Sequence, residues 1–273
     1  MHSIFAANRT ALVTGASSGI GLELTRALAP KADSLIVVAR RVERLEQLAT
    51  DLRSRYSNLR VDVEAADLAD PESLTSLLRR LKEDGRDVDV LINNAGLGES
   101  ELFESSPWSH IQQIVDVTIV ALLRLTHAFL PGMIRRGHGA ILNIGSGAGY
   151  SAMANAAVYT ASKHFVRAFT ESLRAQLAGT PITVSEAAPG PVASEFDQVA
   201  GIEGDYLPAQ RFLRITPRQC AFDIVRAFEK GAPVIFPGRN FRWLMRAQPM
   251  MPRRLLAKQL AEAARRARHA RTA

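Results

Sequence analysis

The sequence predicts an α/β fold: one domain built on a doubly wound parallel sheet with helices on both faces. Three observations predict it. Short apolar runs alternate with stretches of helical periodicity along most of the chain. The first apolar run leads directly into a glycine-rich loop and then into a helix. No internal repeat or low-complexity linker divides the 273 residues, a length that one large domain can accommodate.

The predicted strands are short and apolar, which is typical of strands buried in a parallel sheet. They cover residues 10–14, 34–39, 60–64, 88–92, 140–144, 182–187 and 233–236. The predicted helices have apolar residues at helical spacing and cover residues 22–29, 42–56, 71–84, 107–136, 155–178 and 217–230. Pro71 suits the first turn of its helix, and Asn155 is the expected N-cap of the helix that begins there. Residues 192–215 are expected to be irregular.

Composition limits the classes of function. With 47% hydrophobic and 22% charged residues, the chain resembles an ordinary globular protein. Its single cysteine, Cys220, excludes an intramolecular disulfide and fits a reducing compartment such as the cytoplasm. The six histidines have no metal-ligand spacing, so no metal site is expected. We expect no secretory signal, and no apolar run is judged long enough to span a bilayer.

The net charge of +7 comes from the C-terminal end of the chain. Residues 239–273 contain ten Arg or Lys and one acid, so they carry +9 and leave −2 for the rest. We therefore expect one folded domain over residues 1–238 and a basic tail over residues 239–273, helical over residues 255–271. Three roles are open for this tail: packing on its own subunit or a partner, peripheral attachment to an anionic membrane, and nucleic-acid contact. Nucleic acid is disfavoured because no recognition motif accompanies the charge.

The glycine-rich loop predicts a dinucleotide site. In TGASSGIG, residues 14–21, the glycines permit a tight turn and a close backbone approach to a pyrophosphate. The N–H groups at the start of the following helix would then face the phosphates. The residues expected to contact the cofactor are Gly15, Ser17, Ser18, Gly19, Ile20 and Gly21. Glycines also serve ordinary turns, so the prediction depends on the strand–loop–helix context.

The end of the second strand predicts which dinucleotide binds. A carboxylate there favours NAD, whereas an arginine accommodates the 2′-phosphate of NADP. Here Ala39 is followed by Arg40 and Arg41, with no acid. Because a guanidinium binds phosphate in a bidentate manner, we predict NADP(H) as the cofactor and Arg40 as the stronger ligand. The alternative is that both arginines are solvated loop charges.

Three polar residues in the second half predict proton-transfer chemistry. Tyr159 and Lys163 are four residues apart and share one face of the predicted helix. An ammonium beside a phenol lowers the Tyr pKa from about 10, so Tyr159 can give or take a proton near neutral pH. Ser146, on the loop before the helix, is placed to hold a substrate oxygen. The alternative is a solvated Tyr–Lys pair, which is common at this spacing.

These motifs together resemble the classical short-chain dehydrogenase/reductase (SDR) family over residues 10–196. Residues 14–21 resemble its TGxxxGxG loop, and Ser146, Tyr159 and Lys163 match its catalytic serine and YxxxK motif. Further matches to its cofactor-contacting motifs are Asp67, Leu68, Asn94, Ala95, Gly96, Pro189 and Val192. The resemblance implies a Rossmann-type fold, a homo-oligomer, and hydride transfer between NADP(H) and a small-molecule carbonyl or alcohol.

The resemblance also implies roles for the three polar residues. Tyr159 would protonate the carbonyl oxygen, Lys163 would lower the Tyr159 pKa and bind the nicotinamide ribose, and Ser146 would polarise the substrate oxygen. Thr118 departs from the family, because many members have there an asparagine that helps to hold a proton-relay water. An NADP-binding sensor or scaffold without turnover is therefore an alternative function. A second alternative is a membrane-associated protein whose tail is its function.

The resemblance also implies that the irregular region after the sixth predicted strand, residues 192–215, caps the substrate. Several side chains in and near it would make the cleft apolar: Tyr150, Met153, Phe196, Tyr206 and Phe212. Ordinary packing is the alternative for any single one of them. We expect a hydrophobic or bulky carbonyl substrate.

Overall fold

The computed structural model describes residue 4, residues 9–196, residues 212–247, and residues 262 and 265. Tyr206 and the helix expected over residues 255–271 fall largely outside these residues, so both stay predictions. Within the described part, the expected single parallel sheet is present and organises the chain.

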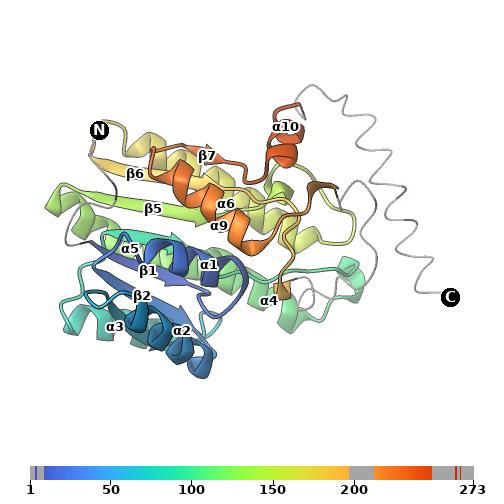
Figure 1. Cartoon of the computed structure of the whole chain (residues 1–273). Helices are drawn as coiled ribbons and strands as arrows, with labels where there is room; N and C mark the ends of the chain where they lie inside the picture. The colour runs from blue at the N-terminus through green and yellow to red at the C-terminus, as the bar shows by residue number, and fades with distance from the viewer. Residues whose placement is uncertain (1–3, 5–8, 197–211, 248–261, 263–264, 266–273) are drawn as a thin grey trace.

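The sheet has seven strands in the described part of the chain, and all of them pair in parallel (Figure 1). They are β1 (Thr10–Thr14), β2 (Ser34–Ala39), β3 (Arg60–Ala65), β4 (Val90–Asn93), β5 (Gly139–Ile144), β6 (Ile182–Ala187) and β7 (Val234–Ile235). Their order across the sheet is β3-β2-β1-β4-β5-β6-β7. The chain reverses direction across the sheet between β1 and β4, and ligands of such sheets bind beyond the carboxyl ends of the strands at that point. The Rossmann-type doubly wound sheet predicted from sequence is confirmed.

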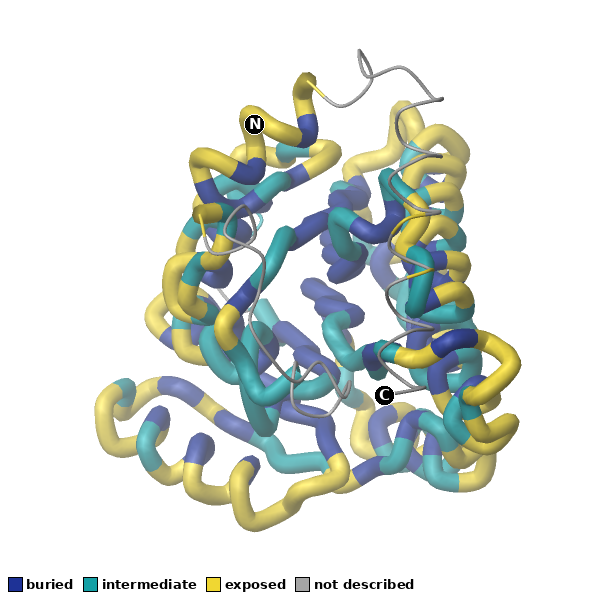
Figure 2. Tube along the Cα trace, turned by 90° about the vertical axis from the view of Figure 1, so that its right-hand side faces the viewer, coloured by how far each residue is buried: buried dark blue, intermediate teal, exposed yellow. Residues whose placement is uncertain are grey.

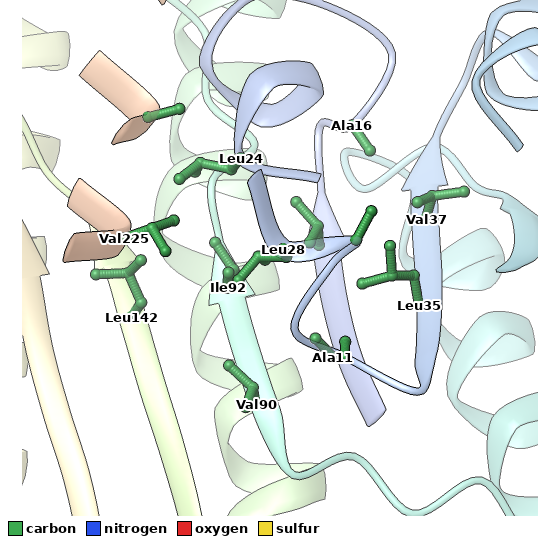
Figure 3. Close-up of a cluster of buried hydrophobic side chains, with 14 of the residues drawn as sticks. Ala11, Ala16, Leu24, Leu28, Leu35, Val37, Val90, Ile92, Leu142 and Val225 are labelled. Atoms are coloured by element: carbon green, nitrogen blue, oxygen red, sulfur yellow. The ribbon is translucent and has the colours of Figure 1, made fainter. Parts of the chain in front are cut away.

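Helices cover both faces of the sheet, as expected. They are α1 (Gly19–Leu28), α2 (Val42–Arg55), α3 (Pro71–Glu83), α4 (Trp108–Val115), α5 (Ala121–Arg136), α6 (Ala157–Gln176), α9 (Pro217–Phe228) and α10 (Arg239–Ala247). On one face α1, α2 and α9 share a core with the sheet, where Leu24, Leu28 and Val225 lie over the strands (Figure 3). On the other face α3, α5 and α6 pack through residues such as Leu77 and Leu125, both fully buried. Buried positions follow the strands and the inward sides of the helices, and exposed ones follow their outer turns (Figure 2).

The single helix expected over residues 107–136 is interrupted. A 3-10 turn, η1 (Phe103–Ser105), comes before α4, and a π-helical turn, η2 (Asp116–Val120), separates α4 from α5. The helix then continues past Pro131 to Arg136, where Gly137 ends it in a left-handed conformation. A π turn inserts one extra residue and rotates the side chains that follow, and such turns are frequent at functional sites. Here it presents the buried Thr118.

The expectation that no apolar segment is long enough to span a bilayer is wrong by length alone. Trp108–Arg136 is a helical stretch of 29 residues whose most apolar window has a mean hydropathy of 1.7. The same stretch carries fully buried residues of the core, Leu125 and Met133 among them, against the sheet. Its apolar character is therefore explained by packing on β4 and β5.

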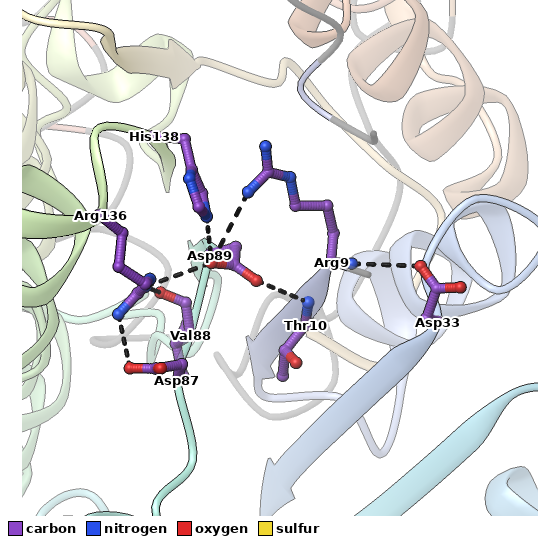
Figure 4. A network of polar contacts seen from close by, with 8 residues as sticks. All are labelled: Arg9, Thr10, Asp33, Asp87, Val88, Asp89, Arg136 and His138. Carbon is purple, nitrogen blue, oxygen red and sulfur yellow. Dashed lines mark hydrogen bonds and ion pairs between the residues drawn. The ribbon is translucent and has the colours of Figure 1, made fainter. Parts of the chain in front are cut away.

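The amino ends of the central strands are joined by a polar network around Asp89 (Figure 4). Its carboxylate accepts a hydrogen bond from the Thr10 backbone N–H at 3.0 Å and lies 3.2 Å from Arg136 and 3.0 Å from His138. Asp89 is 6% exposed. Arg9 approaches the same carboxylate at 3.9 Å. The network fixes β1, β4 and β5 at the edge opposite to the glycine loop.

Candidate active site

The glycine-rich loop between β1 and α1 has the backbone geometry of a phosphate cradle. Gly15 and Gly19 adopt φ angles of +66° and +55°, which residues with side chains rarely adopt. A Cβ on Gly21 would lie 2.2 Å from the carbonyl oxygen of Gly15, so the loop closes on the helix without space for a side chain. The Ser18 side chain caps no backbone N–H of α1 within the described residues. These features fit the pyrophosphate of a dinucleotide, which a helix N-terminus stabilises.

Thr14 and Asn94 join this loop to the end of β4. The Thr14 hydroxyl accepts hydrogen bonds from the backbone N–H groups of Asn94 and Ala95, each at 3.0 Å. The Asn94 side chain in turn donates to the Thr14 carbonyl at 2.8 Å. A Cβ on Gly96 would lie 3.5 Å from Lys163 Nζ, so this segment runs from the glycine loop to the lysine.

The other predicted cofactor residues also follow strands at this edge. Asp67 and Leu68 follow β3 after one intervening residue, Ala66, whose N–H donates to the carbonyl of Ala39 at the end of β2. Pro189 and Val192 follow β6, where the Pro189 carbonyl accepts a hydrogen bond from Gly147 at 2.8 Å and Val192 forms a bridge with Ile215. Ile20 packs against the core from the loop side. The carboxyl edge of the sheet thus gathers all the predicted cofactor segments.

The guanidinium that contacts the glycine loop belongs to Arg41. Its Nε and Nη2 each lie 3.3 Å from the Ser17 hydroxyl, whereas Arg40, which is exposed like Arg41, makes no polar contact with the described residues. Arg44, one helical turn further on, shares the Glu195 carboxylate with Arg41, at 2.7 Å and 3.0 Å. Hydrogen bonds from Arg44 and Arg41 lower the pKa of Glu195. From the sequence, Arg40 was predicted to be the stronger phosphate ligand and Arg44 was missed. The spacing of Arg44, three residues after Arg41 and so on the same side of the helix, could have identified it.

Tyr159 and Lys163 lie together on the first turns of α6. Lys163 Nζ is 5.8 Å from the centroid of the Tyr159 ring and donates a hydrogen bond to the Ile144 carbonyl, at the end of β5, at 2.9 Å. Lys163 is 4% exposed. Burial lowers the pKa of Lys163 to about 8, although the charge of Glu186 raises it. Burial thus moves the pKa of Lys163 toward neutral pH.

Ser146 begins the loop that follows β5, in extended backbone, ahead of the 3-10 turn η3 (Gly147–Gly149). Its hydroxyl oxygen accepts a hydrogen bond from the Ala148 N–H at 3.1 Å, which fixes the side chain at the carboxyl edge. Thr118 reaches the same region from η2, where its Oγ1 would lie 3.9 Å from a Cβ on Gly96. That hydroxyl is buried and makes no hydrogen bond to any described residue.

Glu99 is a site residue that sequence reasoning missed. Its carboxylate accepts hydrogen bonds from the backbone N–H groups of Val158 and Tyr159, at 2.9 Å and 3.2 Å, and is 3% exposed. The prediction of Asn155 as N-cap is wrong, because α6 begins two residues later, after Ala156. Glu99 therefore caps the N-terminus of α6 from the loop that follows β4, although it lies 60 residues before Tyr159 in the sequence. No local sequence pattern predicts a cap from a residue so far away in the chain.

The apolar side chains that were expected to line the cleft do not lie together in the structure. Phe196 packs beside Tyr159, with ring centroids 5.8 Å apart, and Met153 is 41% exposed. Tyr150 turns inward against Phe236. Phe212 is 69% exposed. Of the described candidates, Phe196 is thus the one in contact with the predicted proton donor.

Helix α10, at the start of the basic tail, packs onto the loops that follow β5 and β6. Phe241 of α10 is 6% exposed, and its ring fills the space over Gly147 and Gly190, where added Cβ atoms would lie 2.6 Å and 2.5 Å from it. Met245, one turn on, is also buried. Residues 239–247 therefore belong structurally to the body of the protein, whereas residues 248–261 lie outside the described residues.

Comparison with known proteins decides the family. The family model described as short chain dehydrogenase matches residues 9–202. The chain belongs to the short-chain dehydrogenase/reductase family. Sulfoacetaldehyde reductase 2 of Chromohalobacter salexigens is 38% identical over 218 residues, which are 78% of this chain and 84% of that protein. The recognised SDR resemblance is thereby confirmed, together with the general class of oxidoreductase.

Solved SDR structures share the whole architecture. A short-chain dehydrogenase from Sphingobium yanoikuyae, in complex with NADPH, superposes with a TM-score of 0.80 at 31% identity, covering 91% of this chain and 95% of that one. The bulky-bulky ketone specific alcohol dehydrogenase from Comamonas testosteroni gives a TM-score of 0.75 at 28% identity, with 90% and 93% covered. These relatives include one that binds NADPH and two whose names specify very different carbonyl compounds.

Proposed function

We propose that this SDR enzyme uses NADP(H) in preference to NAD(H) to interconvert a carbonyl and an alcohol, with Tyr159 as general acid and base. The observation that carries the proposal is the placement of Tyr159 beside a buried Lys163 at the carboxyl edge of the sheet. The same edge holds the glycine loop and the Arg41–Ser17 contact. The NADPH-bound relative supports the choice of cofactor.

The residues of this chain would then divide the work as follows. The glycine loop and the N-terminus of α1 would hold the pyrophosphate, and Arg41 with Ser17 would contact the 2′-phosphate. When bound, NADP(H) supplies or accepts the hydride. Ser146 would orient the substrate oxygen, and Tyr159 would give that oxygen a proton in reduction or remove it in oxidation. The Lys163 charge favours the phenolate form of Tyr159.

The substrate we propose is a hydrophobic or bulky carbonyl compound. Phe196 lies against Tyr159 and Met153 is partly exposed nearby in sequence, which favours an apolar substrate side. The bulky-ketone dehydrogenase supports this choice, whereas the sulfoacetaldehyde reductase points to a small anionic aldehyde. Both compound classes therefore belong in the test.

The test is oxidation of NADPH and NADH with aldehydes and ketones from sulfoacetaldehyde to bulky aromatic ketones. Wild type runs beside Tyr159→Phe, and Tyr56→Phe is the matched control, because Tyr56 follows α2 at the opposite edge of the sheet. We expect turnover that prefers NADPH, is lost in Tyr159→Phe and is retained in Tyr56→Phe. Turnover that survives in Tyr159→Phe would contradict the assigned proton donor.

A cofactor sensor without turnover is the second candidate, and Thr118 favours it. Its buried hydroxyl lies near Lys163 in place of the family's asparagine and has no hydrogen-bond partner among the described residues. The sensor requires tight NADPH binding by fluorescence titration and no reduction across the panel. Measurable reduction of any panel member removes it.

Association with a partner or a surface also stays a proposal. A homo-oligomer, expected from the family resemblance, is tested by light scattering on the purified chain. On α10, Trp243 and Leu244 are 65% and 41% exposed beside Arg242 and Arg246, which suits an anionic membrane surface. Because Phe241 is buried, the informative deletion removes residues 248–273 and leaves α10 in place. Binding to anionic vesicles that survives this deletion would assign the contact to α10 or the body.

A further inference from the structure

A further ionisable group, Glu186, is buried beside the strand end that leads to Ser146. Glu186, the penultimate residue of β6, is 2% exposed and faces α6 together with Val184. Burial raises the pKa of Glu186, and a carboxylate is not kept in such a place without partners. Nothing in the hydride-transfer scheme above uses it.

The partners of Glu186 come from the end of the Ser146 loop and from α6. Its Oε2 accepts a hydrogen bond from the Tyr150 hydroxyl at 2.7 Å. The Tyr150 ring stacks over the Arg167 guanidinium at 4.0 Å, and Arg167 comes one helical turn after Lys163 on α6. The charges of Arg167, Lys163 and Arg174 all lower the pKa of Glu186, against its burial.

The remaining carboxylate oxygen points to the backbone that leads into Ser146. Oε1 is buried without a hydrogen-bond partner among the described residues, and a Cβ on Gly145 would lie 2.4 Å from it. Glu186 is in register with Asn143 of β5, and the next residue of that strand, Ile144, accepts the hydrogen bond from Lys163. Glu186, Lys163 and the Ser146 loop therefore meet at the end of one strand.

We propose that Glu186 is a positioning residue of this active site, which holds the Ser146–Tyr150 loop through Tyr150 and supplies the negative charge that keeps Lys163 protonated. The proposal rests on the proposed function of Lys163. The groups that face Lys163 are Tyr159 from its own helix, the Ile144 carbonyl from β5, Thr118 from η2 and Glu186 from β6. Of these, the carboxylate of Glu186 is the one that favours the ammonium by opposite charge across the sheet.

The sign of the effect follows from the charges. The pKa of Lys163 is about 8 with Glu186 opposing the cost of burial, so removal of that negative charge lowers it further. Lys163 then loses its proton at lower pH, and Tyr159 loses the cation that favours its phenolate. Activity should therefore decline earlier on the alkaline side and stay nearly unchanged on the acid side of neutrality.

The experiment is the pH dependence of kcat/KM for the best carbonyl substrate at saturating NADPH, in wild type and Glu186→Gln. The amide keeps an acceptor for the Tyr150 hydroxyl and removes the charge. If the alkaline limb of this pH profile moves to lower pH by about one unit, the kcat/KM of the variant falls about eightfold at pH 8.5 and less than twofold at pH 6.5. Glu171→Gln is the matched control, because Glu171 is an exposed acid on α6, the helix that carries Lys163.

Each outcome decides the question. An alkaline limb that moves to lower pH in Glu186→Gln but not in Glu171→Gln supports the proposal. A profile that coincides with wild type, or that falls by one factor at every pH, overturns it and leaves Glu186 a structural residue. Should Glu186→Gln not fold, Tyr150→Phe removes the donor that stabilises the carboxylate, and an unmoved limb in that variant also overturns the proposal. Absence of wild-type turnover would instead contradict the proposed function.

Discussion

The choice between Arg40 and Arg41 as the ligand of the 2′-phosphate can be decided by two alanine variants. Arg41 contacts Ser17 of the glycine loop, whereas Arg40 makes no polar contact with the described residues. A hydrogen bond to a charged group contributes about 1.5–3 kcal/mol. Because the Arg41 side chain is 42% exposed, solvent screening places its contribution at the lower end, about 1.5 kcal/mol.

That free energy corresponds to about a tenfold change in selectivity. We expect Arg41→Ala to lower kcat/KM for NADPH about tenfold and to change the value for NADH less than twofold, because NADH lacks the phosphate. Arg40→Ala should lower the NADPH value less than threefold. The assay is initial-rate kinetics with both cofactors at low and high salt, since screening should reduce the Arg41 effect. A larger loss in Arg40→Ala, or an equal loss for both cofactors in Arg41→Ala, would refute the reasoning.

Three further predictions concern the cradle, the core and the opposite edge. Gly21→Ala should abolish NADPH binding in a fluorescence titration, because its Cβ would lie 2.2 Å from the Gly15 carbonyl; binding within threefold of wild type would contradict the cradle. Phe241→Ala should lower the free energy of unfolding by about 3 kcal/mol in urea, with a conservative Phe241→Leu losing less. Asp89→Ala should lower the free energy of unfolding by about 3 kcal/mol in urea, because the half-buried Arg9 and Arg136 lose the buried carboxylate that they share, while NADPH affinity of the folded fraction stays unchanged.

The sequence predicted the sheet well because parallel strands are buried on both faces. The runs at residues 10–14, 34–39 and 182–187 match β1, β2 and β6 residue for residue, since mainly apolar residues mark strands that are buried on both faces. The break in the helix over residues 107–136 left no such trace. A π turn displaces the apolar stripe by one residue, and a long helix with many apolar residues hides that displacement.

The site was predictable where it depends on spacing along the chain and not where it depends on distant contacts. Tyr159 and Lys163 share a helix face, so their four-residue spacing located them together. Glu99 and Glu186 approach them from the β4 loop and from β6, and a contact across such separations has no sequence pattern. Arg40 and Arg41 are neighbours on one turn, so the backbone direction after β2 decides which of them reaches the loop.

The packing of Phe241 on two glycines couples positions that are far apart in the chain. Gly147 and Gly190 have no room for a methyl group while that ring is in place. Substitutions at these three positions therefore depend on one another. A chain that loses the aromatic ring at position 241 no longer requires glycine at positions 147 and 190. Among descendants of this sequence the three should be inherited as a set, and Gly190→Ala should be tolerated far better together with Phe241→Ala than alone.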